Sequence, residues 1–138
     1  MIGMVLVTHG GLANALRDAM EHVVGKQKNL ATVCIESDAE FEGQRDEIAR
    51  RMAEVDAGDG VILLTDMFGG TPSNLAMSMA VQPGVEIIGG VNLPMLVKLA
   101  KIRGQETLPE AVAHAEEAGK KYICNGHELQ APTCRAAE

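Results

Sequence analysis

Residues 2–7 and 61–64 form two apolar runs that constrain the fold more than any other feature of this chain. A strand without polar alternation must be covered on both faces, which is typical of the inner strands of a parallel sheet. Apolar residues spaced three and four positions apart follow each run, as an amphipathic helix requires. This alternation of strand and helix predicts an α/β fold with right-handed crossovers.

The remaining elements are predicted from periodicity and from the signals that begin and end helices. We expect strands at about residues 2–8, 30–35, 61–65 and 85–88, and helices at about residues 12–24, 37–55, 71–80, 94–101 and 107–118. Ser37–Glu40 and Thr107–Glu110 match capping boxes. Thr71 with Pro72 matches an N-cap followed by proline at the first helical position.

The predicted sheet is open, twisted and mostly parallel, with helices on both faces and the flavodoxin-like strand order 2-1-3-4. A short last strand at Tyr122–Cys124 would add an antiparallel edge strand. Residues 1–124 then form a single domain, an ordinary size for one hydrophobic core. Residues 125–138 lack periodicity and are expected to be a frayed tail.

The composition excludes several classes of function. Aromatic residues make up 2% of the chain and its formal net charge is −7, which argues against a nucleic-acid binding protein. Cys34, Cys124 and Cys134 lack the spacing of a disulfide framework and are expected to be free thiols. No segment has the features of a signal peptide or the length to span a bilayer, so we expect a cytoplasmic protein without membrane insertion.

His9 is the residue best placed for chemistry. In an open parallel sheet the ligand site lies beyond the carboxyl ends of the strands, where the strand order reverses. Here that point falls between the strands that end at His9 and Asp66, so that the two residues become neighbours on strands about 4.8 Å apart. Asp66 can accept the proton of one ring nitrogen and leave the other free to attack. We therefore expect a nucleophilic histidine oriented by an aspartate.

The residues that follow this aspartate suit a phosphoryl group. Gly69 and Gly70 let the backbone approach closely, and the helix start at Thr71 offers amides and hydroxyl groups, including that of Ser73. The chain contains neither GxxxxGK[ST] nor GxGxxG. Nucleotide binding is therefore not indicated, and no cofactor is expected.

Ordinary structural roles are the alternative for each of these residues. A histidine after a strand is commonly a hydrogen-bonded loop residue, an aspartate there is commonly a turn former, and Thr-Pro is commonly a helix cap. Their joint placement at one reversal of strand order favours a functional site. Cys124, His127 and Cys134 lack a fourth ligand and the usual spacing of a zinc centre, so no metal is expected.

Three motifs taken together resemble a known family. Val7–Gly10 (VTHG), Asp66–Asn74 (DMFGGTPSN) and Gly90–Leu96 (GVNLPML) occur in the order and spacing of the EIIA domain of the mannose family of the bacterial phosphotransferase system. The match covers about residues 1–120. The resemblance implies an open α/β sheet, a cytoplasmic location and a homodimer in which the last strand can be exchanged between subunits.

The resemblance also implies roles for individual residues. His9 would accept a phosphoryl group from the phosphocarrier protein HPr and pass it to an EIIB partner, and Asp66 would be the hydrogen-bonded partner of His9. The phosphoryl group would lie among Thr8, Gly10, Gly69, Gly70, Thr71 and Ser73. A partner-docking rim would be formed by Phe68, Asn92, Pro94 and Met95.

Two features depart from the family pattern. The chain ends at Glu138 without a fused EIIB domain, so we expect a separate EIIB protein as the acceptor. Residues from Lys120 onward match the family poorly, which leaves the dimer mode open. One alternative function is the phosphoryl-donor subunit of a phosphotransferase-dependent dihydroxyacetone kinase, and another is a non-catalytic sensor module switched by phosphorylation of His9. The complete glycine-rich motifs favour the mannose type, whether in transport or in regulation.

Overall fold

Four parallel strands form one sheet in the computed structural model, which describes residues 1–36 and 41–130. The strands are β1 (Gly3–His9), β2 (Leu30–Ile35), β3 (Val61–Thr65) and β4 (Val85–Ile88). They lie in the order β2-β1-β3-β4. The predicted fold class and strand order are therefore confirmed.

The register of the two inner strands places their carboxyl ends side by side. Val7 of β1 is paired with Thr65 of β3, so that His9 and Asp66 leave the sheet at the same edge. All five residues of β3 are buried, because helices cover both of its faces. The edge strand β2 instead alternates between half-buried and buried positions, as expected for a strand with one neighbour.

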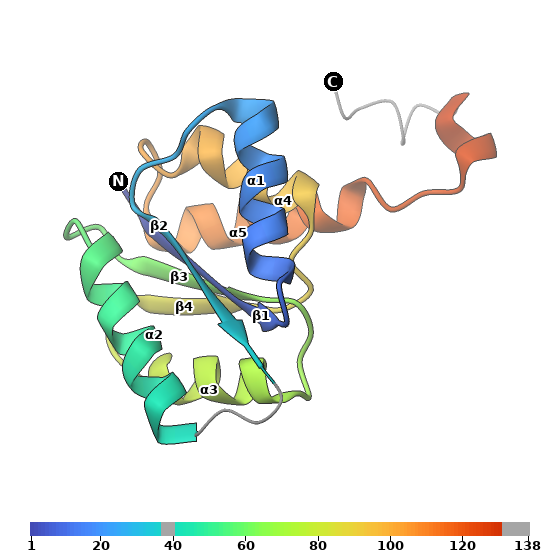
Figure 1. Cartoon of the computed structure of the whole chain (residues 1–138). Helices are drawn as coiled ribbons and strands as arrows, with labels where there is room; N and C mark the ends of the chain where they lie inside the picture. The colour runs from blue at the N-terminus through green and yellow to red at the C-terminus, as the bar shows by residue number, and fades with distance from the viewer. Residues whose placement is uncertain (37–40, 131–138) are drawn as a thin grey trace.

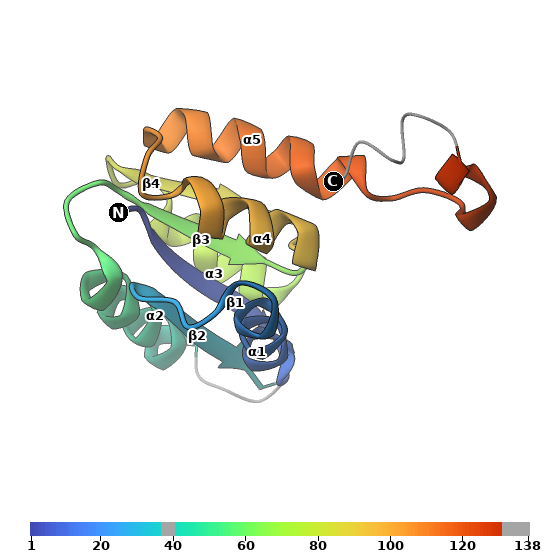
Figure 2. The same ribbon diagram turned by 90° about the horizontal axis from the view of Figure 1, so that it is seen from above.

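Helices cover the sheet in two layers (Figures 1 and 2). One face carries α1 (Leu12–Val24), α4 (Leu93–Ile102) and α5 (Leu108–Lys121), and the other carries α2 (Phe41–Val55) and α3 (Thr71–Met79). Successive strand residues point to opposite faces, so Met4 and Leu6 enter the first core while Val5 and Val7 enter the second. Both cores are built from aliphatic side chains, in keeping with the low aromatic content.

Helix starts follow the predicted signals with one correction. Thr107 and Glu110 form the expected capping box of α5, through bonds of 3.0 and 3.4 Å. The N-cap of α3 is Gly70, whereas Thr71 was predicted, so Thr71 is already the first helical residue. Extended backbone at the glycine, with ψ of 177°, turns the chain into the helix one residue earlier than the proline signal indicates. The capping box predicted at Ser37–Glu40 lies outside the described residues.

The predicted last strand is wrong for the described chain. Helix α5 continues to Lys121, and Tyr122–Cys124 adopts no strand. Small residues at positions 115, 118 and 119 keep α5 packed to its end, and the chain then leaves the body of the molecule (Figure 2). Of the tail predicted to fray, Gly126–Gln130 forms a short 3-10 helix, and residues 131–138 lie outside the described part.

The guanidinium of Arg103 is buried just beyond α4, which sequence reasoning does not predict. It donates to the carbonyl oxygens of Lys28 and Asn29, the latter at 3.0 Å, and to the sulfur of Met4 at 3.4 Å. Burial lowers the pKa of Arg103 to about 10. The contacts tie the end of α4 to the segment that enters β2.

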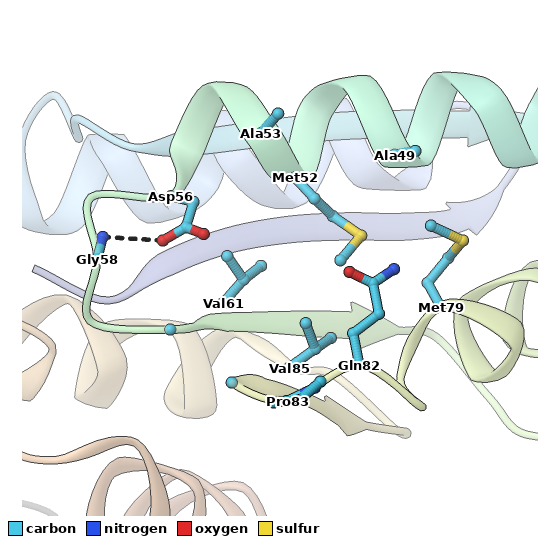
Figure 3. Close-up of a pocket in the computed structure, with 12 residues that line it drawn as sticks. Ala49, Met52, Ala53, Asp56, Gly58, Val61, Met79, Gln82, Pro83 and Val85 are labelled. Carbon is cyan, nitrogen blue, oxygen red and sulfur yellow. Dashed lines mark hydrogen bonds between the residues drawn. The ribbon is translucent and has the colours of Figure 1, made fainter.

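A cavity of about 380 Å³ opens at the amino end of the sheet (Figure 3). Met52 of α2 and Met79 of α3 form its apolar wall, and Gln82 points between them. Asp56 lies at one side, where its carboxylate accepts a hydrogen bond of 2.8 Å from the Gly58 amide. Because His9 lies at the carboxyl end of β1, this cavity is separate from the predicted site.

Candidate functional site

The ring of His9 is held by Asp66 at the reversal of strand order. Its Nδ1 lies 2.8 Å from Asp66 Oδ2, and the His9 amide donates to the same oxygen at 3.0 Å. The histidine side chain is 52% exposed and that of the aspartate 12%. A carboxylate that accepts from Nδ1 fixes the proton there, so the lone pair resides on Nε2. The structure thus offers Nε2 as the nucleophilic atom.

The carboxylate of Asp66 is kept ionised by hydrogen bonds. Burial, the largest single influence, opposes its charge, but the amide and ring of His9 and the amide of Met67 together outweigh burial and lower the pKa of Asp66. Its second oxygen accepts from the Met67 amide at 3.0 Å and from the Thr65 hydroxyl at 3.4 Å. A charged, oriented carboxylate can stabilise positive charge that develops on the neighbouring ring.

Gly70 lies directly against the free edge of the His9 ring. A Cβ atom at this position would be 2.8 Å from His9 Cε1 and 2.9 Å from Nε2. Only glycine therefore fits without moving the ring. Gly69 has φ of +102°, a conformation that also favours glycine. The two residues bring backbone, without side chains, to the nucleophilic nitrogen.

Helix α3 points its N-terminus at this same edge, since Gly70 is its N-cap. The first amides of a helix have no intrahelical acceptor, and the helix dipole favours an anion there. Thr71 is exposed at the first helical position. An anion carried on Nε2 would therefore lie near the start of α3, where the helix dipole is favourable.

No cationic side chain lies in the loops that surround the site. Residues 9–16, 66–80 and 88–97 contain no lysine or arginine.

Two of the predicted phosphoryl contacts lie elsewhere. Thr8 is fully buried, and strand alternation turns its side chain to the sheet face opposite His9. The Ser73 hydroxyl is also buried and is bonded to the backbone of Gly69 and Gly70. Gly10 does flank His9, with φ of +51° and an amide that donates to Ile35 O at 3.1 Å.

Of the predicted docking rim, Phe68 is the clearly exposed member. Phe68 is 55% exposed. Its ring packs closely on Gly89, where a Cβ atom would be 2.4 Å from Phe68 Cδ2. Met95 is only 3% exposed and contributes to the core, so its assignment to the rim is wrong. Asn92 and Pro94 are half-buried at the start of α4.

Asn92 serves to join two helices. Its side chain accepts from the Met95 amide at 3.1 Å, which caps α4, and donates to Gly119 O at 2.9 Å, which holds α5. A Cβ on Gly119 would be 2.8 Å from Met95 Cε. Close contact between α4 and α5 thus explains why residues 92 and 95 face inward.

Metal ligands and membrane spans were sought throughout the described residues. Within residues 1–36 and 41–130 there is no group of three histidine, cysteine or acidic side chains that could hold a metal ion. No helix in the same ranges has the length and apolarity needed to cross a membrane. Cys34 forms no disulfide with any residue that the structure describes, and Cys134 lies outside the described part.

Comparison with known proteins gives consistent matches. Residues 3–116 match the EIIA-man family, described as PTS system fructose IIA component. The mannose-specific EIIAB component of Escherichia coli K12 is 33% identical over 124 residues, which cover 88% of this chain and 38% of that protein. The fructose-specific EIIA component of Bacillus subtilis is 25% identical over 130 residues, covering 92% and 89% of the two chains.

Solved structures share the fold. The EIIA component from Streptococcus agalactiae superposes with a TM-score of 0.82 at 22% identity, covering 91% of this chain and 97% of the other. The mannose/sorbose-specific IIA subunit from Enterococcus faecalis gives a TM-score of 0.79 at 26% identity, with 90% and 93% covered.

Proposed function

This chain belongs to the EIIA family of the mannose and fructose type of the phosphotransferase system, and from that premise we propose that it is a cytoplasmic phosphoryl carrier. It accepts a phosphoryl group from the phosphocarrier protein HPr on Nε2 of His9 and passes it to an EIIB acceptor. The observation that carries this proposal is the 2.8 Å bond between His9 Nδ1 and Asp66, which leaves Nε2 free beside Gly70. A homodimer is part of the same proposal.

The transfer step is an exchange of one phosphorus–nitrogen bond for another. The lone pair of Nε2 attacks the phosphorus of the donor phosphohistidine, and the donor ring leaves with the electron pair of the broken bond. The proton on Nδ1 stays in its bond to Asp66, so the His9 ring gains positive charge opposite a carboxylate. The donor is already activated, and no nucleotide enters the step.

The phosphoryl oxygens are stabilised by the start of α3. We expect amides at the start of α3 and the Thr71 hydroxyl to bind the group, because Gly70, the N-cap of α3, lies against Nε2. Backbone donors that are already in place need no reorganisation during transfer. Residues 9–16, 66–80 and 88–97 contain no lysine or arginine that would form an ion pair with the phosphoryl group.

Phosphorylation by the known upstream proteins tests the proposal. The chain is incubated with phosphoenolpyruvate, Enzyme I and HPr, and its mass is measured before and after acid treatment. We expect one acid-labile phosphoryl group, absent from His9→Ala and present in the control His22→Ala, which changes an exposed histidine on α1. An unmodified wild-type chain, in a mixture that labels another EIIA protein, would contradict the proposal.

The acceptor is identified by adding EIIB proteins one at a time. The matched relatives carry different sugar names in their descriptions, including mannose, fructose and sorbose. We expect loss of the phosphoryl group from His9 with a preferred EIIB protein. Retention of the group with every EIIB protein would contradict the carrier role and favour a sensor. Sedimentation of the purified chain tests the homodimer.

A further inference from the structure

Ser73 lies behind the glycine loop that faces His9, and we infer that it is a positioning residue for phosphoryl transfer. Its hydroxyl holds Gly69 and Gly70 in the conformation that places backbone against Nε2. The kinetic part of this inference rests on the proposed function, whereas its structural part can be tested without any transfer.

The hydrogen bonds of Ser73 use the full capacity of its hydroxyl group. Its oxygen accepts from the Gly69 amide at 3.0 Å and from the Gly70 amide at 3.3 Å, and its proton is donated to Gly70 O at 2.9 Å. A serine hydroxyl has one donor and two acceptor positions. The residue is 1% exposed, so solvent does not compete for these bonds.

Gly69 has little besides Ser73 to fix its conformation. Gly69 is exposed with φ of +102°, and nothing lies within 4 Å of the position that its Cβ would occupy. Two successive glycines have the largest conformational freedom to lose on ordering. Besides Ser73, the pair is held by a hydrogen bond of 3.0 Å from the Asn74 amide to Gly70 O and by the approach of Gly70 to the His9 ring. Ser73 therefore links the well-packed helix α3 to the position of Nε2.

A purely structural role for Ser73 makes a different prediction. A residue at the third helical position that bonds to the N-cap amide stabilises the helix start by about 1 kcal/mol. If that were the whole role, its loss would lower the melting temperature and leave transfer by the folded molecules unchanged. The two roles are therefore separated by the rate of transfer per folded molecule.

Ser73→Ala is compared with the matched variant Ser78→Ala. Ser78 lies on the same helix, and its hydroxyl donates to Leu75 O at 2.6 Å, away from the site. For Ser73→Ala we expect kcat for transfer from phosphorylated HPr to fall about tenfold, equivalent to about 1.4 kcal/mol. KM for HPr should stay unchanged, because the docking surface is intact. Ser78→Ala should transfer at the wild-type rate, and Ser73→Thr, which retains the hydroxyl, should recover most of the lost rate.

Hydrogen exchange provides a readout that does not depend on transfer. In the wild-type chain the Gly69 and Gly70 amides should exchange slowly despite their place in a surface loop, and in Ser73→Ala they should exchange at least about tenfold faster. This wild-type measurement keeps the inference testable even if a variant fails to fold.

The outcomes distinguish this inference from the proposed function. Rapid exchange of both glycine amides in the wild-type chain would overturn the inference, as would equal kcat values for Ser73→Ala and Ser78→Ala. A wild-type chain that takes no phosphoryl group would overturn the proposed function, while slow exchange of the two amides would still support the role of Ser73 in shaping the loop.

Discussion

Two glycine-containing loops leave neighbouring strands at the same edge of the sheet and serve different purposes. Residues 66–70 follow β3 and residues 89–92 follow β4, and each loop contains a glycine pair and leads into a helix with proline near its start. The first loop directs its hydrogen bonds at His9. The second directs them at α4 and α5, and its Val91 amide is bonded to Thr65 O at 3.1 Å.

The comparison indicates that a glycine pair before a helix with proline near its start specifies a loop conformation but not the function of the loop. Asp66, the first residue of its loop, is charged and turned toward the histidine, whereas Asn92, the last residue of the second loop, caps α4 and donates to Gly119 O. The role of each loop depends on the element next to it, because β1 lies beside the first loop and α5 lies over the second. Changes in the first loop should therefore alter transfer, and changes in the second should alter stability.

Met95→Ala should have the largest effect, and on stability alone. The side chain is 3% exposed beneath Gly119, so its truncation leaves a cavity and should cost about 2–5 kcal/mol of the free energy of unfolding. Met67→Ala is the matched control in the first loop, where the residue is 58% exposed, and should cost less than about 0.5 kcal/mol. Urea denaturation of both variants measures the difference. Similar losses of free energy of unfolding in the two variants would contradict the proposed difference between the two regions.

Gly70→Ala should act on transfer alone. The added methyl group would meet His9 Cε1 and Nε2 at under 3 Å and push the ring from its orientation. We expect the rate of phosphoryl transfer to fall about 100-fold, equivalent to about 2.7 kcal/mol. Gly104→Ala, where a methyl group meets nothing within 4 Å, is the control. Wild-type rates for Gly70→Ala, measured by rapid quench, would show that the close approach has no role in transfer.

Asn92→Ala should lower stability by about 1–2 kcal/mol, since it removes the cap of α4 and the bond to Gly119 O. Asn92→Asp keeps the capping acceptor and loses only the donor, so its loss should be smaller. Phosphoryl transfer per folded molecule should match that of the wild type in both variants. A slower rate in the Asp variant, with its stability retained, would place Asn92 in the functional rim after all.

Asp66, in the first loop, should make the free energy of unfolding of the protein depend on pH. Its pKa is lower in the folded chain than its ordinary value, so the contribution is present above the unfolded pKa of about 3.9 and is lost as pH falls through the folded value. The stability difference between wild type and Asp66→Asn should therefore shrink as pH is lowered below 4. Thermal denaturation across pH 3–7 measures it. A difference that grows toward low pH would contradict the assigned direction.

Phe68→Ala should have the smallest effect. The ring is 55% exposed over Gly89, so we expect less than about 1 kcal/mol of lost stability and a rise of about threefold in KM for HPr. Steady-state transfer assays with varied HPr measure KM. An unchanged KM would remove Phe68 from the docking rim.

Much of this architecture could be predicted from local sequence. The unbroken apolar runs require inner strands, and the strand-helix alternation leads to the observed order β2-β1-β3-β4. The approach of His9 to Asp66 followed from the same topology, because both residues end strands at the reversal of strand order.

The remaining features depend on contacts distant in sequence. Met95 looks like a rim residue until α5 packs across the start of α4, a contact that no local spacing reveals. The third position of α3 does not by itself determine whether the Ser73 hydroxyl faces a bound group or the preceding loop. The turn at Gly70 brings the Gly69 and Gly70 amides to this hydroxyl, so it bonds to the loop. The buried guanidinium of Arg103 finds its carbonyl partners in a segment some 75 residues away.

The nitrogen that carries the phosphoryl group tests the central claim most directly. The chain is labelled with ¹⁵N-histidine, phosphorylated through Enzyme I and HPr, and examined by ¹H–¹⁵N and ³¹P NMR spectroscopy. Because Nδ1 is held by Asp66, the phosphoryl group should appear on Nε2 of His9, with the Nδ1 proton still in its hydrogen bond. A phosphoryl group on Nδ1, or on a residue other than His9, would contradict the account.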